Sequence, residues 1–272
     1  MIRKPAVAGQ FYPASRDELR KMIADSSPAV EKPEKALGAL SPHAGYVFSG
    51  RTAGEVFARI EIPSTVVLLN PSHHYPSPPC ALWTGGPWRT PLGDVELHED
   101  LTNALAELPM VSRDDVPHVP EHSGEVVLPF IQYHRPDVRI AVICITDSAD
   151  IQQLIELGRG IKEALERCGE ADALVVASSD MSHEDGREAL KVVNEHDALA
   201  IAEMERCSPQ GLLHVCRKHG VTMCGVLPAA AMMESVRARG GKGGVLVARA
   251  TSADSPHGRG SYVVGYAGMI FR

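Results

Sequence analysis

Short apolar runs that stop at polar, proline-containing loops recur along the first two thirds of the chain. The clearest of these runs is predicted as a strand over 65–70, where Val-Val-Leu-Leu is followed by Asn-Pro-Ser-His-His. Such a run is typical of a buried strand, and proline ends it because proline has no N–H to donate to a neighbouring strand. Similar runs predict strands over 36–40, 138–145 and 174–177.

Between these strands, apolar positions repeat with the spacing of an amphipathic helix. The longest pattern covers 149–167, where apolar residues recur every three or four positions. Further helices are predicted over 16–25, 98–107, 121–132, 186–204, 209–219 and 224–239, and one more ends near Ile60. Two strands, over 244–251 and 261–271, follow the last helix.

The alternation of strands and helices predicts the α/β class. We expect a single-domain three-layer α/β/α sandwich with a mostly parallel or mixed central sheet. No linker, repeat or low-complexity run divides the 272 residues, so one domain is expected over 1–272. The segment Gly-Gln-Phe-Tyr-Pro within residues 1–14 predicts an ordered arm that packs its aromatic side chains on the domain.

Charge and composition exclude several classes of protein. A formal net charge of -7 argues against a nucleic-acid partner, which would call for a basic patch. No apolar run approaches the roughly 20 residues of a membrane helix, so no membrane partner is expected. The six cysteines are scattered without Cys-x-x-Cys pairs, which favours reduced thiols and a cytoplasmic location.

Ionisable residues follow three of the predicted strands. His43 comes after the first strand, His73 and His74 after the second, and Asp180 and His183 after the strand over 174–177. Ligands of open α/β sheets bind beyond the carboxyl ends of the strands, so these loops would converge on one site if the strands are neighbours. Any one of these histidines alone is more typical of a hydrogen-bonded loop residue.

Three further features each have a structural and a functional interpretation. Cys224 precedes an Ala- and Met-rich helix, whose N-terminus would lower the thiol pKa, or it packs as a small buried residue. Glu121, His122 and Glu125 are either a salt-bridged helix face or a cluster that orients a ligand or moves protons. Arg51 is either an anchor for an anionic substrate group or a surface arginine.

Six motifs in order carry a resemblance to a known family. They are Ala-Val-Ala-Gly with Phe-Tyr-Pro at 6–13, Pro-His-Ala-Gly-Tyr at 42–46, Pro-Ser-His-His at 71–74, Glu-His-Ser at 121–123, Ser-Ser-Asp-Met-Ser-His at 178–183 and Cys-Gly at 224–225. Together they make the chain similar to the MEMO family over nearly its whole length. The fold of that family resembles the LigB-like class III extradiol dioxygenases, which use non-haem Fe(II).

The resemblance implies a metal site and a set of residues around it. Its three metal ligands would be His43, His73 and Cys224. Its catalytic residues would be Asp180, His183 and His122. Fe(II) is the expected ion, with copper and zinc as alternatives. A thiolate replaces the carboxylate of the usual two-histidine, one-carboxylate triad, so ring-cleaving dioxygenation does not follow from the fold.

Three functions compete at this point. The first is a metal-dependent redox or oxygenase-type enzyme acting on an unknown small substrate. The second is a zinc-dependent hydrolase, with Asp180 as general base. The third is a module that binds a peptide, a phosphopeptide or a partner protein, since relatives are associated with signalling and motility. Bacterial and archaeal relatives are encoded beside radical-SAM proteins, which implies a radical-SAM partner protein.

Overall fold

One mixed β-sheet forms the centre of the protein. The computed structural model describes residues 2–74, 78–258 and 260–272, and within these ranges the sheet has 11 strands. The strands are β1 (Gly38–Ser41), β2 (Thr65–Pro71), β3 (Cys80–Leu82), β4 (Trp88–Thr90), β5 (Gly93–Leu97), β6 (Val111–Arg113), β7 (Arg139–Ile145), β8 (Leu174–Ser178), β9 (His183–Glu184), β10 (Gly244–Thr251) and β11 (Val263–Phe271). The main path through the sheet runs β10-β11-β1-β8-β2-β7-β3-β6.

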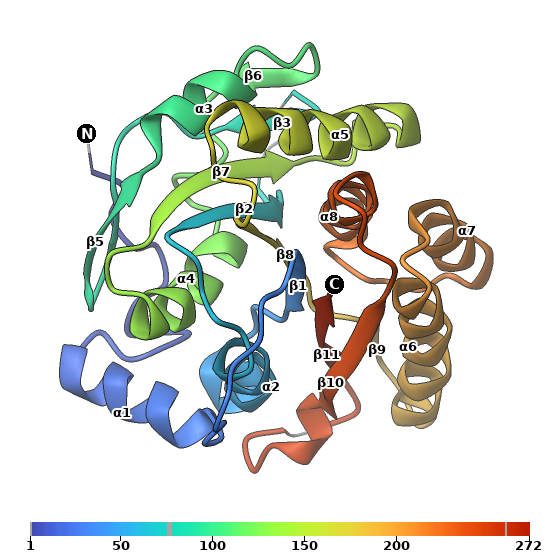
Figure 1. Ribbon diagram of the computed structural model, residues 1–272. Helices are drawn as coiled ribbons and strands as arrows, with labels where there is room; N and C mark the ends of the chain where they lie inside the picture. Colours follow the sequence, from blue (N-terminus) through green and yellow to red (C-terminus); the bar gives the residue numbers. More distant parts are fainter. Residues whose placement is uncertain (1, 75–77, 259) are drawn as a thin grey trace.

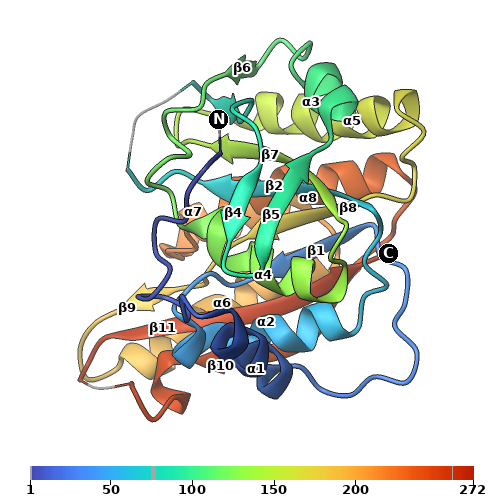
Figure 2. The same cartoon turned by 90° about the vertical axis from the view of Figure 1, so that its left-hand side faces the viewer.

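The four strands at the middle of this path, β1, β8, β2 and β7, are all parallel. On one side β11 pairs antiparallel with β1, and on the other β3 pairs antiparallel with β7. The arrowheads of β2 and β7 point toward the left of the view in Figure 2, the side on which β9 lies. Parallel neighbours end at the same edge, so the loops after β1, β8 and β2 are adjacent.

Helices cover both faces of the sheet, as Figure 1 shows. They are α1 (Arg16–Ser26), α2 (Tyr46–Ala58), α3 (Glu99–Leu105), α4 (Ser123–His134), α5 (Ile151–Arg167), α6 (Ala189–Glu205), α7 (Pro209–His219) and α8 (Val226–Ala238). One face carries α1, α2 and α4, and the other carries α5, α8 and the neighbouring helices. The predicted α/β sandwich with a mixed central sheet is therefore confirmed.

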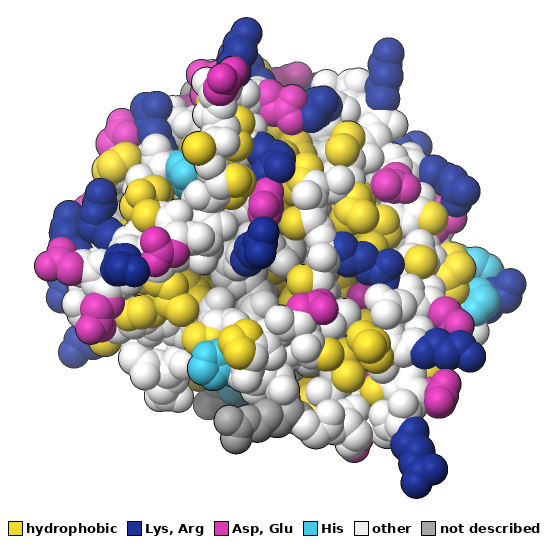
Figure 3. Space-filling model, turned by 90° about the horizontal axis from the view of Figure 1, so that it is seen from below, with side chains coloured by type: hydrophobic (Ala, Val, Ile, Leu, Met, Phe, Trp, Pro, Cys, Tyr) yellow, Lys and Arg dark blue, Asp and Glu magenta, His cyan; other side chains and the backbone are white. Residues whose placement is uncertain are grey.

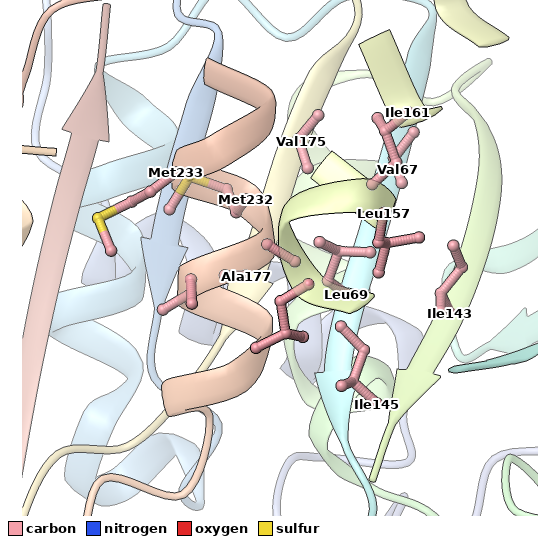
Figure 4. Close-up of a cluster of buried hydrophobic side chains, with 14 of the residues drawn as sticks. Val67, Leu69, Ile143, Ile145, Leu157, Ile161, Val175, Ala177, Met232 and Met233 are labelled. Carbon is pink, nitrogen blue, oxygen red and sulfur yellow. The ribbon is translucent and has the colours of Figure 1, made fainter. Parts of the chain in front are cut away.

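Alternation along β2 explains the two cores. Val67 and Leu69 pack toward α5 and α8, whereas Val66 and Leu68 pack toward α2 and α4. Successive side chains of a strand point to opposite faces, so a fully apolar strand is stable only when both faces are covered. Figure 4 shows the first core, in which α5 and α8 bury aliphatic and methionine side chains against β2, β7 and β8.

At the site, two helices begin two residues later than predicted. The helix predicted from Glu121 begins at Ser123, so Glu121 and Glu125 do not share a helix face. The Glu121 carboxylate instead accepts hydrogen bonds from the backbone and hydroxyl of Ser123, ahead of the first turn. The helix predicted from Cys224 begins at Val226. The short strands β6 and β9 were not predicted, because they carry too few residues to show a pattern.

Within the described ranges, no helix combines the length and the apolar character that a bilayer crossing demands.

His118 is completely buried and packs its ring edge-on to Trp83 and Trp88. Desolvation lowers its pKa from 6.5 to about 4. Between about pH 6.5 and pH 4, the His118 imidazole is neutral in the folded protein but takes up a proton in the unfolded chain. The free energy of unfolding therefore falls as the pH falls through this range. Across this pH range, the depressed pKa of His118 is expected to lower the free energy of unfolding by about 3 kcal/mol.

Urea denaturation at several pH values measures this effect, with His118→Gln as the comparison. The variant should show a flatter dependence of unfolding free energy on pH between pH 6.5 and 4 than the wild type. Parallel curves for the two proteins would show that His118 does not drive the acid sensitivity.

Candidate functional site

The loops after three adjacent parallel strands meet in one pocket of about 520 Å³. His43 follows β1, His73 follows β2 and Asp180 follows β8. His122, the residue before α4, and Cys224, just before α8, also line the pocket. With His183 of β9, all six ligand and catalytic residues implied by the resemblance line this one pocket, whereas Arg51 lies outside it. Their chemical roles stay predictions.

The hydrogen bonds of His43 fix which ring nitrogen faces the pocket. The Ser178 hydroxyl donates to the carbonyl of Ser123 at 2.7 Å, so its oxygen accepts the proton on His43 Nδ1, also at 2.7 Å. His43 Nε2 then keeps its lone pair and lies 3.3 Å from Cys224 Sγ. Desolvation, followed by the nearby imidazoles, holds the pKa of this buried ring well below its usual range. His43 is thus a neutral imidazole whose unprotonated Nε2 faces the Cys224 thiol.

His73 is held by a buried carboxylate. Its Nδ1 donates to Glu121 Oε1 at 2.9 Å, and its backbone N–H donates to Oε2 at 2.6 Å. Desolvation is the largest single influence and opposes the charged form of His73. The hydrogen bond to Glu121 and the negative charges of Glu121 and nearby aspartates together outweigh it and raise the pKa. A carboxylate that grips one ring nitrogen orients the other toward a ligand, as in carboxylate–histidine–metal arrangements. Glu121 is therefore the group that orients His73.

His122 brings a third imidazole close to the other two. Its ring stacks on that of His73 at a centroid distance of 4.8 Å and lies edge-on to that of His43 at 5.5 Å. One donor atom from each of these three histidines lies within 4.8 Å of the other two. Desolvation lowers the pKa of His122, which favours the neutral ring. The exposed His74 groups with Glu121 and His122 in the same way, at the outer side.

Asp180 and Cys224 form the floor beside His43. The Asp180 carboxylate accepts from the backbone N–H groups of His43 at 2.8 Å and Ala44 at 3.2 Å, and burial raises its pKa. The Asp180 N–H donates to Cys224 Sγ at 3.2 Å. Desolvation raises the pKa of the Cys224 thiol, opposite to the direction predicted from a helix N-terminus, because the helix starts later and the thiol is enclosed.

The glycine after Cys224 is required by the close approach of two chain segments. A Cβ at Gly225 would lie 2.3 Å from the carbonyl oxygen of Ser178. The Gly225 N–H donates to Ser179 Oγ at 2.8 Å, which ties the Cys224 segment to the end of β8. At Gly124, a Cβ would lie 2.9 Å from Asn70 Oδ1, which explains a glycine in the first turn of α4.

The N-terminal arm packs on the domain, as predicted, and it also forms one wall of the pocket, which was not predicted. Tyr12 is buried, and Phe11 lines the pocket with its ring 5.0 Å from that of His122. Glu125 fixes the arm by accepting from Arg3 at 2.7 Å and from Tyr12 at 2.7 Å, as well as from two backbone N–H groups. The sequence predicted packed aromatics here, but not their place beside the imidazoles.

Other wall residues were missed entirely. They are Phe48 of α2, His257, Tyr262, and Val264 and Tyr266 of β11. Nothing in the chain marks them, because scattered aromatic residues on a helix, a loop and a strand have the pattern of core residues. Near the lower edge of Figure 3, a histidine lies among hydrophobic side chains.

The donor atoms fit a transition-metal ion. Metal–ligand bonds of about 2.0–2.3 Å place two ligands of one ion at most about 4.6 Å apart. In the pocket, His43 Nε2 lies 3.3 Å from Cys224 Sγ, which is within this limit. The donor atoms of the three imidazoles lie within 4.8 Å of one another, so one ion could bind all three after a shift of at most a few tenths of an ångström. Imidazole and thiolate together suit iron, zinc or copper better than magnesium or calcium. A bound cation would also favour the thiolate form of Cys224.

Fold and pocket together define an α/β sandwich protein with an imidazole-rich pocket, suited to a metal ion, at the ends of its parallel strands. The chain belongs to the Memo-like protein family, whose model matches residues 3–270. A MEMO1 family protein of Aquifex aeolicus is 40% identical over 99% of this chain and 99% of its own. A second, of Methanopyrus kandleri, is 38% identical over 100% of this chain and 99% of its own.

Among solved structures, an uncharacterised protein of Escherichia coli K12 is similar with a TM-score of 0.48 and 13% identity. The match covers 84% of this chain and 98% of that one. This likeness is too weak to bear on the site.

Proposed function

We propose that this protein binds a ferrous ion through His43, His73 and Cys224 and carries out redox or oxygenase-type chemistry on a small substrate. The observation that supports it most is the 3.3 Å approach of Cys224 Sγ to His43 Nε2, a nitrogen that carries no proton. A bound ferrous ion would supply electron transfer and the activation of O₂. Two histidines and one cysteine would leave positions open for a small molecule.

The chain's own residues have distinct parts in this proposal. Glu121 orients His73, and Ser178 fixes the tautomer of His43. Asp180 is a positioning residue, since its carboxylate binds the backbone of the His43 loop and its N–H binds Cys224. His122 and His183 line the pocket on different elements and are the candidates to hold or move a proton.

Zinc-dependent hydrolysis is the second candidate, and the close approach of three imidazoles favours it. His43, His73 and His122 each offer a donor atom within 4.8 Å of the others, a set that would suit catalytic zinc with a bound water. The general base would then be Asp180, whose raised pKa follows from its burial. In this case Cys224 would lie beside the ion rather than bind it.

Elemental analysis of protein purified without air, followed by ferrous titration of wild type and Cys224→Ser, tests the proposal. We expect one iron per chain and a weaker affinity in the variant, because an alcohol is a poor substitute for a thiolate ligand. Activity that requires ascorbate and is lost in air would support iron. Zinc in place of iron, with tolerance of air and full retention in Cys224→Ser, would overturn it in favour of the hydrolase.

A further inference from the structure

The pocket has two chemically different parts, and the outer one has no role in holding a metal. The inner part carries the imidazoles, the thiol and Asp180. The other part consists mainly of flat or apolar side chains, from the exposed Tyr262 to the buried Tyr266, with Ser252 and His257 as its polar side chains. Phe11, Phe48 and Val264 also belong to it. A volume of about 520 Å³ suits a small molecule of one or two rings.

Flat surfaces continue from the metal-binding end to the mouth. Phe11 lies edge-on to His122, and His122 stacks on His73 at 4.8 Å with an interplanar angle of 27°. At the outer side, Phe48 lies near His257 at 6.4 Å, and Tyr262 is 56% exposed at the rim. Aromatic walls recognise planar apolar faces, by stacking or by edge-to-face contact.

The charge of the lining is as informative as its shape. Of the residues that line this pocket in the described part of the chain, none is lysine or arginine. Its one carboxylate, that of Asp180, already accepts two backbone hydrogen bonds. The charged form favoured on His73 is already paired with the Glu121 carboxylate. An anionic group that leaves water here would therefore meet no unpaired positive side chain, and burying an unpaired charge is costly.

Cations lie instead in a neighbouring groove. Lys21 and Arg51 line a separate groove of about 710 Å³ that shares Phe48 and His257 with the pocket. Lys21 is paired with Asp25 at 2.7 Å. Neither Lys21 nor Arg51 lines the pocket itself, and Phe48 and His257 belong to the linings of both hollows.

We propose that the pocket takes a neutral molecule with a flat apolar face, of one or two rings, rather than an anionic ligand such as a carboxylate or a phosphorylated side chain. Its polar atoms would face the imidazole end, and its ring would lie between the aromatic walls. That this molecule is the substrate rests on the proposed function. That the aromatic walls bind it does not depend on the proposed function.

Calorimetric titration of the full chain, stripped of metal with a chelator, tests this class of ligand. The probes share one ring system and differ in charge: naphthalene methanol, naphthoate and naphthyl phosphate. We expect the alcohol to bind at least about tenfold more tightly than either anion, because the walls offer no counter-charge. Equal or tighter binding of naphthoate or naphthyl phosphate would overturn the proposal.

Two variants assign the binding to the walls. Phe48→Ala should weaken the alcohol about tenfold by removing one aromatic face, with Phe48→Leu as a milder change that keeps the volume. Val47→Ala is the matched control, since Val47 lies next in the helix but lines only the neighbouring grooves. Equal binding by Phe48→Ala and wild type would overturn the assignment. Because the probes are titrated into protein without metal, this test does not depend on iron binding. Either proposal can therefore fail without the other.

Discussion

The double variant His73→Ala/Cys224→Ala is expected to fold and to bind no stoichiometric metal. Each substitution removes one proposed donor, and His43 with His122 alone would hold an ion weakly. A single orienting residue is commonly worth about 10- to 100-fold in metal affinity, so the loss of two ligands should exceed 100-fold. Anaerobic reconstitution with ferrous iron, followed by elemental analysis, measures the change.

A matched control separates lost ligands from lost structure. Cys168→Ala removes a thiol at the end of α5, remote from the pocket lining, and should keep full metal content. Circular dichroism should report the same helix content for all three proteins. Undiminished metal in the double variant would rule out His73 and Cys224 as the ligands.

Glu125→Ala is expected to cost about 3–5 kcal/mol of unfolding free energy, the largest loss of stability that we predict. Glu125 and Arg3 form an ion pair at 2.7 Å with both side chains 1% exposed. Removal of the carboxylate leaves a buried guanidinium without its partner. It also leaves the Tyr12 hydroxyl and the backbone N–H groups of Ala6 and Val7 without an acceptor.

Urea denaturation checks this prediction, with an exposed ion pair as control. Glu107→Ala breaks the surface pair with Arg167 at 2.9 Å and should shift the midpoint little, because exposed pairs contribute weakly. Replacing both partners, in Arg3→Met/Glu125→Leu, should recover part of the loss, since the uncompensated charge is gone. A shift for Glu125→Ala no larger than that for Glu107→Ala would contradict the assigned role.

The sequence predicted the sheet and the convergence of its loops because both depend on local patterns. Apolar runs ended by polar loops marked β1, β2 and β8 separately, and their adjacency brought His43, His73 and Asp180 together. From the residues alone, nothing separated His73 from His74. Only the fold does so, because the buried Glu121 carboxylate grips His73 while His74 is exposed.

What the sequence could not predict depends on contacts between distant residues. The carbonyl of Ser123, the first residue of α4, decides the direction of the Ser178 hydroxyl and with it the tautomer of His43. The direction of the Cys224 pKa shift depends on enclosure by the end of β8, which outweighs any effect of a nearby helix end. The metal, the substrate and a radical-SAM partner stay predictions.

The proposed metal donors are also far apart along the chain, and this has a consequence for assembly. Cys224 and His43 are separated by 181 residues, and the arm contact from Arg3 to Glu125 spans 122. In zinc fingers, donors a few residues apart let the ion organise an unfolded chain. Here the ion could only enter a pocket that the sheet has already built. Refolding rates should therefore be the same with and without metal, and metal uptake should follow as a separate, later step.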